Sequence, residues 1–306
     1  LNTVSKSSSP GNRRTGNKKA GVSAARLASL KILRRVFSGQ SLSSVQAQII
    51  DKLGDSRDRG LANEIVNGVL RWRWQLEYYI SQLLSKPLKT KDSDVQLILL
   101  MATYELTECR TPDYAIINEA VELVRAPGEK GAGKKWAASL VNAVLRRFTR
   151  EKDALVTSLE LEESRRQARF SHPEWMLEKI ENDWPQQWQK ILAANNQRPT
   201  FWLRVNRRQY SAEQYRQLLH DQGIEAEVSS LSEQALKLSH GIDVRLLPGF
   251  SEGAVSVQDA GAQLSAELLA VGDGQRVLDL CAAPGGKTCH VLERYDNIQQ
   301  LLAVEL

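Results

Sequence analysis

The stretch Arg276-Val-Leu-Asp-Leu-Cys-Ala-Ala-Pro-Gly-Gly-Lys-Thr288 decides the fold of the C-terminal part of this chain. Residues 276–280 are mostly apolar and predict a short strand, residues 281–286 are small and predict a tight turn, and a helical pattern begins at Lys287. A strand, a glycine turn and a helix N-terminus form the ligand-binding corner of an open α/β sheet, beyond the carboxyl ends of the strands. The free N–H groups at the start of such a helix favour an electron-rich partner.

Three kinds of binding turn compete for this corner, besides an ordinary glycine turn of some other α/β domain. A P-loop needs G-x-x-x-x-G-K-[ST], and although residues 286–288 fit its end, Cys281 stands where its first glycine belongs. A dinucleotide fingerprint needs G-x-G-x-x-G, which residues 284–286 do not supply. The third is the S-adenosylmethionine (SAM) turn of a Rossmann-like methyltransferase, which needs an acid at the end of the next strand to hold the ribose. Residues 298–304 predict that strand and Glu305 ends it, so the sequence favours the third.

Residues 278–288 resemble, nearly letter for letter, the first SAM motif of the Sun family of RNA cytosine-C5 methyltransferases. Two upstream segments, Asn195-Asn-Gln-Arg-Pro199 with the following Trp202-Leu-Arg-Val-Asn206, and Val257-Gln-Asp259 ahead of Gln263, resemble the part that precedes the catalytic fold in bacterial members. Residues 140–148 resemble the last helices of the NusB-like domain that some members carry. The resemblance therefore covers the chain from about residue 23 to its end.

The resemblance implies a SAM-dependent methylation of cytosine C5 in 16S rRNA, with SAM as cofactor and the rRNA as partner. It assigns the cofactor contacts to the turn and to the strand-end acid, namely Cys281, Ala282, Ala283, Pro284, Gly285, Gly286, Lys287 and Glu305. The family usually has Asp where Glu305 stands, and Glu keeps the charge on a longer arm.

No catalytic residue is assigned in this chain. In the family a cysteine thiolate adds to C6 of the base so that C5 becomes nucleophilic, and that cysteine and a second one lie in Asp-Ala-Pro-Cys and Thr-Cys motifs that this sequence lacks. Cys281 and Cys289 are better placed to line the cofactor than to attack a flipped base. We therefore expect a truncated enzyme that binds SAM weakly and is inactive alone. The alternative is a NusB-like RNA-binding or antitermination module with a vestigial methyltransferase end.

Size and composition are those of a multidomain globular protein. The chain has 306 residues, of which 42% are hydrophobic and 25% charged, enough for two or more separate cores. It has no run of 18 apolar residues, so we expect no membrane partner and a cytoplasmic location. The three cysteines show neither CxxC nor zinc-ligand spacing, which predicts no metal site.

Charge divides unevenly along the chain. Residues 1–150 hold 25 Lys and Arg against 13 Asp and Glu (net +12), whereas residues 151–306 hold 16 against 23 (net −7). Such a basic half suits a polyanionic partner. The candidates for RNA contact are arginines in an Arg-Trp-Arg-Trp segment, along one helix face and near the first strand: Arg71, Arg73, Arg146, Arg147, Arg150, Arg204 and Arg207. Core packing of the tryptophans and ordinary solvation of the arginines are the competing interpretations.

The pattern predicts five segments. Residues 1–22 are a Ser/Gly/Lys/Arg-rich, disordered basic tail, 23–152 an all-α NusB-like domain that binds RNA, and 153–198 a helical linker. Residues 199–258 form an α+β subdomain of the RNA-recognition-like kind, and 259–306 begin a Rossmann-like α/β methyltransferase domain that is incomplete.

Apolar periodicity and breaker residues place the individual elements. Helices are predicted at 23–39, 42–53, 57–85, 92–108, 114–125, 134–152, 212–222 and 258–269, and a capping box at 171–174. Extended segments are predicted at 201–206, 225–229, 244–247 and 254–258.

Overall fold

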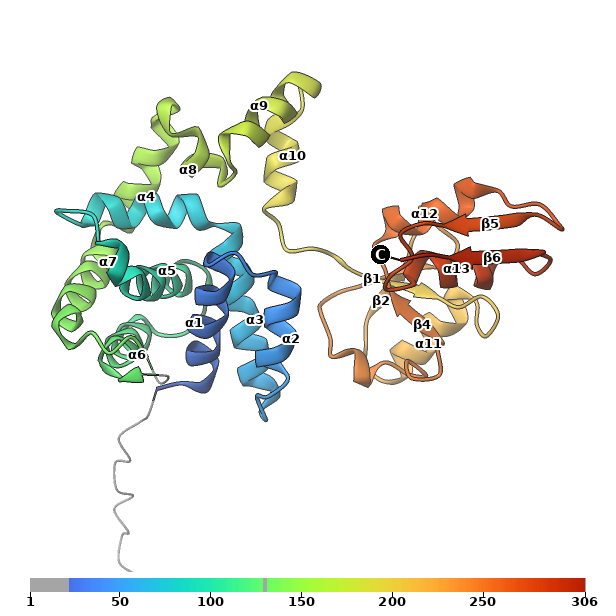
Figure 1. Cartoon of the computed structure of the whole chain (residues 1–306), viewed down its shortest axis with the longest axis horizontal. Coiled ribbons are helices and arrows are strands. Elements are labelled where there is room, and N and C mark those ends of the chain that lie inside the picture. Colours follow the sequence, from blue (N-terminus) through green and yellow to red (C-terminus); the bar gives the residue numbers. More distant parts are fainter. Residues whose placement is uncertain (1–21, 129–130, 306) are drawn as a thin grey trace, which may run out of the picture. The chain divides into compact units, whose positions relative to one another are not determined.

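The computed structural model describes residues 22–128 and 131–305. The chain divides between Gln197 and Arg198 into a helical unit and an α+β unit, shown in Figure 1. The predicted disordered tail at 1–22 lies outside the described residues, apart from Val22.

The helical unit is built around one buried helix, α5 (Ser93–Glu108), as Figure 1 shows. Leu97, Leu99 and Leu100 are among its many buried residues, because this helix is apolar on all sides. Its neighbours are α1 (Ala24–Phe37), α3 (Ser56–Arg71), α4 (Arg73–Leu83), α6 (Asp113–Arg125) and α7 (Ala138–Leu161), with α2 (Leu42–Ile50) against α1. Short helices complete the unit: η1 (Thr90–Asp92), η3 (Lys135–Ala137), η4 (Glu163–Arg165), α8 (Arg166–Phe170), α9 (Glu174–Asp183) and α10 (Trp188–Asn195).

A buried ion pair crosses this core. Arg26 of α1 donates from Nε to Oε1 of Glu105 at 3.0 Å and from Nη2 to Oε2 at 2.5 Å. Burial raises the pKa of Glu105, and the hydrogen bonds and charge of Arg26 oppose that rise. The bidentate geometry satisfies both buried charges, and it fixes α1 on the last turns of α5.

Two helix predictions are wrong in their boundaries. The single helix predicted at 57–85 is two helices, α3 and α4, which meet at Trp72 without a Gly or Pro to signal the break. The helix predicted to end at 152 continues to Leu161, because Leu155 and Leu159 extend its buried face, so the predicted domain boundary falls inside α7.

The predicted capping box at 171–174 is wrong. Ser171 takes a left-handed conformation (φ 52°) at the end of α8, and Pro173 precedes α9 without a side-chain cap. The Ser171 hydroxyl therefore does not reach the amides at the start of α9.

The α+β unit begins with a four-stranded antiparallel sheet in the order β2-β3-β1-β4. Its strands are β1 (Phe201–Val205), β2 (Ala226–Val228), β3 (Ala235–Leu238) and β4 (Val255–Val257). Helix α11 (Ala212–Asp221) buries Tyr215 and Leu219 in the same apolar core as Leu203 and Leu236. Strand β3 was missed, and the segment predicted as extended at 244–247 instead contains a 3-10 turn, η5 (Val244–Leu246), whose entry Asp243 caps.

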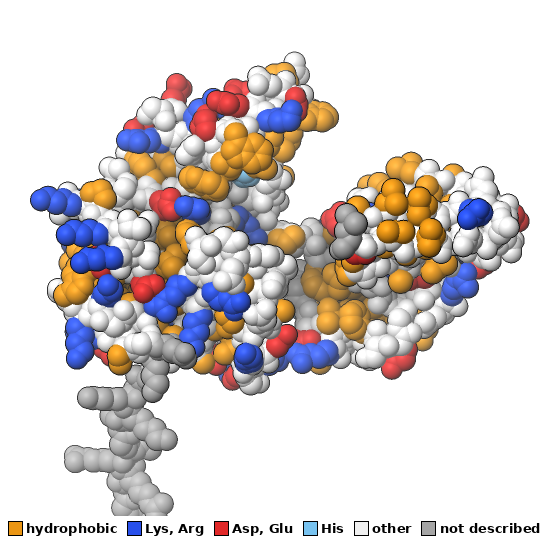
Figure 2. Space-filling view, in the orientation of Figure 1, with side chains coloured by type: hydrophobic (Ala, Val, Ile, Leu, Met, Phe, Trp, Pro, Cys, Tyr) orange, Lys and Arg blue, Asp and Glu red, His pale blue; other side chains and the backbone are white. Residues whose placement is uncertain are grey.

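The rest of this unit is a parallel βαβ element. Helix α12 (Ala260–Leu269) leads to β5 (Arg276–Asp279), α13 (Gly286–Arg294) and β6 (Gln300–Ala303), and β5 pairs with β6 in register from Arg276↔Gln300 to Asp279↔Ala303. Leu278, Leu280 and Leu302 are more than half exposed, and Figure 2 shows hydrophobic side chains gathered on this part of the molecule. Parallel strands are ordinarily buried on both faces, so this pair presents an uncovered apolar surface.

Candidate cofactor turn and nucleic-acid surface

The predicted cofactor turn lies at the carboxyl ends of β5 and β6. Asp279 closes β5, the chain turns through Cys281 to Gly285, and α13 begins at Gly286. Gly285 has φ +93°, a conformation that favours glycine. Cys281, Ala283, Pro284 and Lys287 are exposed, so a ligand can reach the turn. The first N–H groups of α13 have no partner within the helix, which suits an electron-rich group beyond Gly285.

The strand-end acid Asp279 organises the turn. Its Oδ2 accepts a hydrogen bond from the Thr288 hydroxyl at 2.6 Å, and its Oδ1 lies 3.4 Å from the Cys281 N–H that donates to it. In a P-loop this threonine hydroxyl would be turned to a magnesium ion. Here it is bonded to the strand end, which agrees with the exclusion of a P-loop from the sequence.

Glu305 reaches the turn from the next strand. Its Oε2 accepts a hydrogen bond from the Ala283 N–H at 2.8 Å, while Ala282 donates its N–H to the Val304 carbonyl at 3.2 Å. The structure thus brings together the two features that the sequence paired, the small-residue turn and the acid about 20 residues later. The assignment of these residues to SAM stays a prediction. Their small side chains, exposed backbone and carboxylate fit such a cofactor.

The structure contradicts the prediction that Arg204 contacts RNA. Its side chain is 0% exposed and forms a bidentate ion pair with Glu293 of α13. Strand β1 lies between β3 and β4, and the Arg204 side chain also donates to the Gly286 carbonyl of α13, so it is enclosed and cannot reach RNA. The neighbouring Arg207 is exposed, and its RNA contact stays a prediction.

His290 is a buried polar residue of α13. Its Nε2 lies 2.8 Å from the Gln234 carbonyl oxygen, so Nε2 carries the proton. Burial, reinforced by the positive charges of Arg204 and Arg294, lowers the pKa of His290 from 6.5 to about 4. In the sequence His290 is one of four scattered histidines, and nothing beyond that marks it.

We expect His290 to make the α+β unit acid-sensitive. The unfolded chain takes up the imidazole proton near pH 6.5 and the folded chain only near pH 4, so this contribution is complete above pH 6.5 and is lost as the pH falls through that window. The loss is about 3 kcal/mol of unfolding free energy. This loss is measured by urea unfolding at several pH values, with hydrogen exchange of the α13 amides as the readout. His290→Gln, which can still donate to Gln234, should flatten the dependence; an equally steep fall in that variant would assign it to carboxylates.

The Arg-Trp-Arg-Trp segment is partly engaged within the protein. Arg73 lies over the rings of Phe37 (4.6 Å) and Trp74 (5.8 Å) and pairs with Glu77 at 2.9 Å. Trp72 packs against the helical core, as the competing interpretation held, while Arg71 is half-buried. RNA contact by Arg71 and Arg73 stays a prediction.

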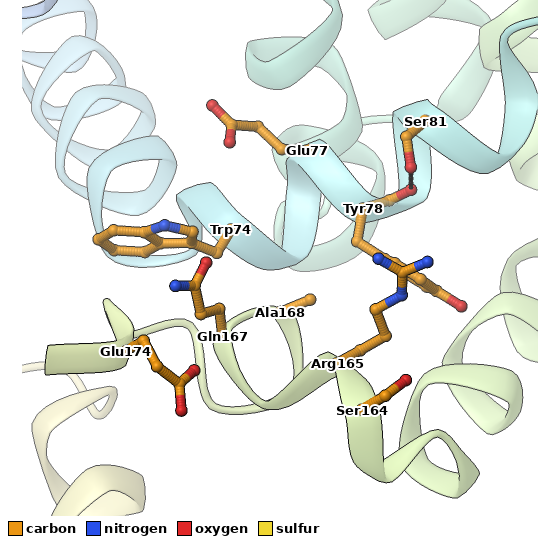
Figure 3. Close-up of a pocket in the computed structure, with 9 residues that line it drawn as sticks. All are labelled: Trp74, Glu77, Tyr78, Ser81, Ser164, Arg165, Gln167, Ala168 and Glu174. Carbon is orange, nitrogen blue, oxygen red and sulfur yellow. Dashed lines mark hydrogen bonds between the residues drawn. The ribbon is translucent and has the colours of Figure 1, made fainter. Parts of the chain in front are cut away.

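Trp74 lines the open cavity drawn in Figure 3, which has a volume of about 360 Å³. In this view its indole lies near Gln167, while Glu77 and Glu174 stand at opposite sides and Arg165 closes a third. Two carboxylates against one guanidinium do not favour a phosphate group. This cavity is therefore a weaker RNA candidate than the basic surfaces of the unit.

The predicted arginine stripe on α7 lies on the surface opposite the buried Val141, Val144, Leu145 and Phe148. Arg146, Arg147 and Arg150 are exposed. Arg147 pairs with Glu151 at 2.8 Å, and this partner raises the pKa of the Arg147 guanidinium. The stripe is thus partly neutralised by the helix itself, and its contact with RNA stays a prediction.

The structure also assembles a basic surface that the sequence reading missed. Two segments about 45 residues apart meet around a cavity of about 410 Å³, and the Lys134 ammonium bonds the Lys91 carbonyl (3.3 Å) and Asp92 (3.1 Å). We call it the lysine–tryptophan patch; its residues are Lys89, Lys91, Lys134, Lys135 and Trp136. Trp136 is 57% exposed, so its ring is accessible for stacking on a base. The signal in the sequence was Lys134-Lys135-Trp136, two cations followed directly by an aromatic ring.

Two findings bear on other ligands. Across 22–128 and 131–305, none of the helices combines the length and apolar character needed to span a bilayer. Within the same residues, no three His, Cys, Asp or Glu side chains gather as metal ligands would.

The fold and the site define a chain of three parts: a helical bundle, an antiparallel α+β subdomain, and a parallel βαβ element with a glycine turn between its first strand and its helix. Residues 23–150 match the NusB family, residues 172–245 match the ferredoxin-like domain of RsmF/B-like methyltransferases, and residues 266–306 match the 16S rRNA methyltransferase RsmB/F family. The chain is a homologue of ribosomal RNA small subunit methyltransferase B. This confirms the resemblance and the fold class inferred from the sequence.

Curated proteins of that name set the extent of the likeness. The chain is 45% identical to the one from Pseudomonas putida and 44% identical to the one from Pseudomonas syringae pv. tomato, over 282 residues each, and 41% identical to that from Citrobacter koseri over 283. These alignments cover 92% of this chain but only 61–63% of each relative. The crystal structure of PH0851 aligns over 94% of this chain and 64% of its own with a TM-score of 0.67; at 16% identity this shows a shared fold alone.

Proposed function

We propose that this chain forms the RNA-binding and cofactor-binding part of an enzyme that transfers a methyl group from SAM to C5 of a cytosine in 16S rRNA. The observation that carries the proposal is the turn between β5 and α13, which the Glu305 carboxylate joins from the end of β6. It falls in residues that match the 16S rRNA methyltransferase RsmB/F family.

Each part of the turn has a role in this proposal. When bound, SAM supplies an electrophilic methyl group. Gly285 and Gly286 allow the backbone to approach the methionine part, and the Cys281–Pro284 segment forms the wall of the site. Glu305 exchanges its hydrogen bond to the Ala283 N–H for the ribose hydroxyls, a contact that its longer arm permits from the same strand end.

No residue of this chain is proposed as the nucleophile. Cys281 and Cys289 are exposed, but both lie at the turn that we assign to the cofactor, where a thiol faces SAM rather than a flipped base. We propose that the chain binds SAM weakly and does not transfer the methyl group by itself. We also propose a cytoplasmic location, where its rRNA substrate is made.

The test is a methyl-transfer assay with tritiated SAM on unmodified 16S rRNA. It compares this chain with one extended at its C-terminus to the length of the Pseudomonas putida relative. Transfer only by the extended form supports the proposal. Transfer by the 306-residue chain contradicts the exclusion of its cysteines, and Cys281→Ser and Cys289→Ser would then identify the nucleophile. No transfer by either form contradicts the assigned reaction.

The second candidate is an RNA-binding module without catalysis, which the lysine–tryptophan patch favours. Exposed lysines around a solvent-accessible tryptophan provide phosphate neutralisation and a stacking surface, the two components of single-strand binding. RNA binding that persists in the absence of any SAM affinity would support this candidate over the enzyme.

We predict that the lysines and the tryptophan of the patch both contribute to RNA affinity, but that only the contribution of the lysines depends on salt. Replacing Lys89 and Lys91 by Gln should lower affinity for an unpaired rRNA fragment and reduce the slope of log affinity against log salt by about 1.5. Trp136→Ala should lower affinity by about tenfold or more and leave that slope unchanged, because stacking releases no counterions. Fluorescence anisotropy over a salt series measures both.

Matched controls lie on α9. Trp175 is 66% exposed and Lys179 pairs with Asp183 on the same helix, so Trp175→Ala and Lys179→Gln change the same chemistry away from the patch. Both should leave affinity and slope unaltered. Equal losses from the α9 variants would show that binding is spread over the unit rather than held by the patch.

A further inference from the structure

Arg204 is a fully engaged charged side chain of the α+β unit. It projects from β1 and is 0% exposed. Its Nε and Nη2 donate to the two oxygens of Glu293 at 2.9 and 2.7 Å, and Nη2 also donates to the Ser256 hydroxyl at 3.3 Å. Nη1 donates to the Gln258 side-chain oxygen and to the Gly286 carbonyl, both at 2.6 Å. These bonds use all five N–H groups of the guanidinium.

Stability alone does not explain this arrangement. A buried ion pair can often be replaced by apolar residues of similar volume without loss of stability, since both charges must give up their water. What an apolar pair cannot reproduce is direction. The planar fork aims two nitrogens at Glu293 near the end of α13 and the third at the carbonyl of Gly286, the first residue of that helix.

A second contact holds the same face of α13. Gln234 donates to the Val205 carbonyl of β1 at 2.9 Å and accepts from His290 at 2.8 Å. Gly286, His290 and Glu293 are spaced four and three residues apart, so they lie on one side of the helix. The contacts from Arg204 and Gln234 therefore fix both the position of α13 along its axis and its rotation about that axis.

We propose that Arg204 is a positioning residue that sets the cofactor turn against the ferredoxin-like sheet. Gly286 directly follows Gly285, so the guanidinium donates to the backbone one residue beyond the turn. Arg204 contacts neither reacting group; it acts through the backbone of the turn. The inference rests on the proposed function only in naming SAM as the ligand of that turn, because the mechanical link is a property of this chain.

The consequence is a coupling between two parts of the α+β unit. The sheet carries the exposed Arg207 beside β1, and the turn carries Glu305 and the glycines. A shift of β1 is passed to the first residue of α13 through one rigid group. Lysine cannot replace it, since a single ammonium cannot bond Glu293, Gln258 and the Gly286 carbonyl in three fixed directions.

The first test uses hydrogen exchange of the full chain without ligand. In Arg204→Lys, the hydrogen-bonded amides of the turn should exchange about tenfold faster, namely those of Ala282, Ala283, Gly285 and Cys289. The amides of Leu203 and Leu236 in the sheet should stay within about twofold of wild type. The matched control is Arg216→Lys, whose arginine pairs with Glu213 in the same unit and should change neither. A uniform rise across the unit, or no rise at the turn, overturns the proposal.

The second test separates positioning from stability. The double variant Arg204→Met with Glu293→Met removes both charges and leaves an apolar pair. The thermal unfolding midpoint of the double variant should lie close to that of wild type. Its affinity for S-adenosylhomocysteine, measured by calorimetry, should still be about tenfold weaker than that of wild type. Recovery of midpoint, turn protection and affinity together would make Arg204 merely structural and would overturn the proposal.

The two tests fail separately from the proposed function. If wild type binds no S-adenosylhomocysteine, the assigned cofactor is wrong, and the exchange experiment alone still decides whether Arg204 positions the turn. If wild type binds it and Arg204→Lys binds it equally with an unchanged turn, the positioning role is wrong and the function stands.

Discussion

Replacing Gly285 by valine is expected to weaken SAM binding by about 10- to 100-fold. Gly285 has φ +93°, a conformation that a β-branched residue avoids at a cost of roughly 1–3 kcal/mol. A Cβ built at this position meets nothing closer than the Cys289 Sγ at 3.9 Å, so space is available and the penalty is one of backbone conformation. The chain would relieve it by rotating the turn, which would move the backbone that we assign to the methionine part of SAM. Calorimetric titration with SAM measures the loss.

Gly253 provides the matched control. It lies in the same unit with φ +73° and open space around its Cβ position, between η5 and β4. Gly253→Val should therefore lower the unfolding free energy by a similar amount and leave SAM affinity unchanged. Tight SAM binding that survives Gly285→Val together with Glu305→Ala would contradict the assignment of both residues. A loss in Gly253→Val as large as that in Gly285→Val would show that affinity merely follows stability.

Local features of the fold could be predicted because each has a short-range cause. The turn at 281–286 is fixed by its small residues. The strand before it was predicted from a short apolar run, and the helix after it from a helical apolar pattern. The ends of the bundle helices were predicted from helix-breaking residues such as Pro87, Pro112 and Gly128. Where a boundary had no breaker, at Trp72, the prediction joined two helices, because nothing local marks a change of direction that packing alone imposes.

The failure at Arg204 has a different cause. A charged residue between Leu203 and Val205 is consistent with a strand whose other face is solvated. The residues that bury it, Gly286 and Glu293, lie 82 and 89 positions further on, and no local pattern reports them. The same holds for the lysine–tryptophan patch, whose two segments meet only after folding. Sites formed by contacts distant in sequence are thus the ones that the structure adds.

Substitution of Gly68 by alanine is expected to destabilise the helical unit by about 2–3 kcal/mol, although the same change in an exposed helix position stabilises. Gly68 of α3 faces the ring of Tyr104 on α5, and an added Cβ would lie 1.9 Å from its Cζ. The ring is 2% exposed and its hydroxyl is hydrogen-bonded to Glu64, so it cannot move aside cheaply. The absence of a side chain at this one position therefore sets the distance between α3 and the central helix α5.

Gly60, in the same helix, isolates that effect. It is exposed, and a Cβ there meets nothing within 4 Å, so Gly60→Ala should raise the unfolding free energy by about 0.5–1 kcal/mol through helix propensity alone. Urea unfolding followed by far-ultraviolet circular dichroism compares the two variants. Adding Tyr104→Leu to Gly68→Ala should cost less than the sum of the single changes, because the smaller side chain makes room for the methyl group. Stabilisation by Gly68→Ala would contradict the close contact between α3 and α5. Strict additivity with Tyr104→Leu would contradict it as well, because residues in contact are not independent.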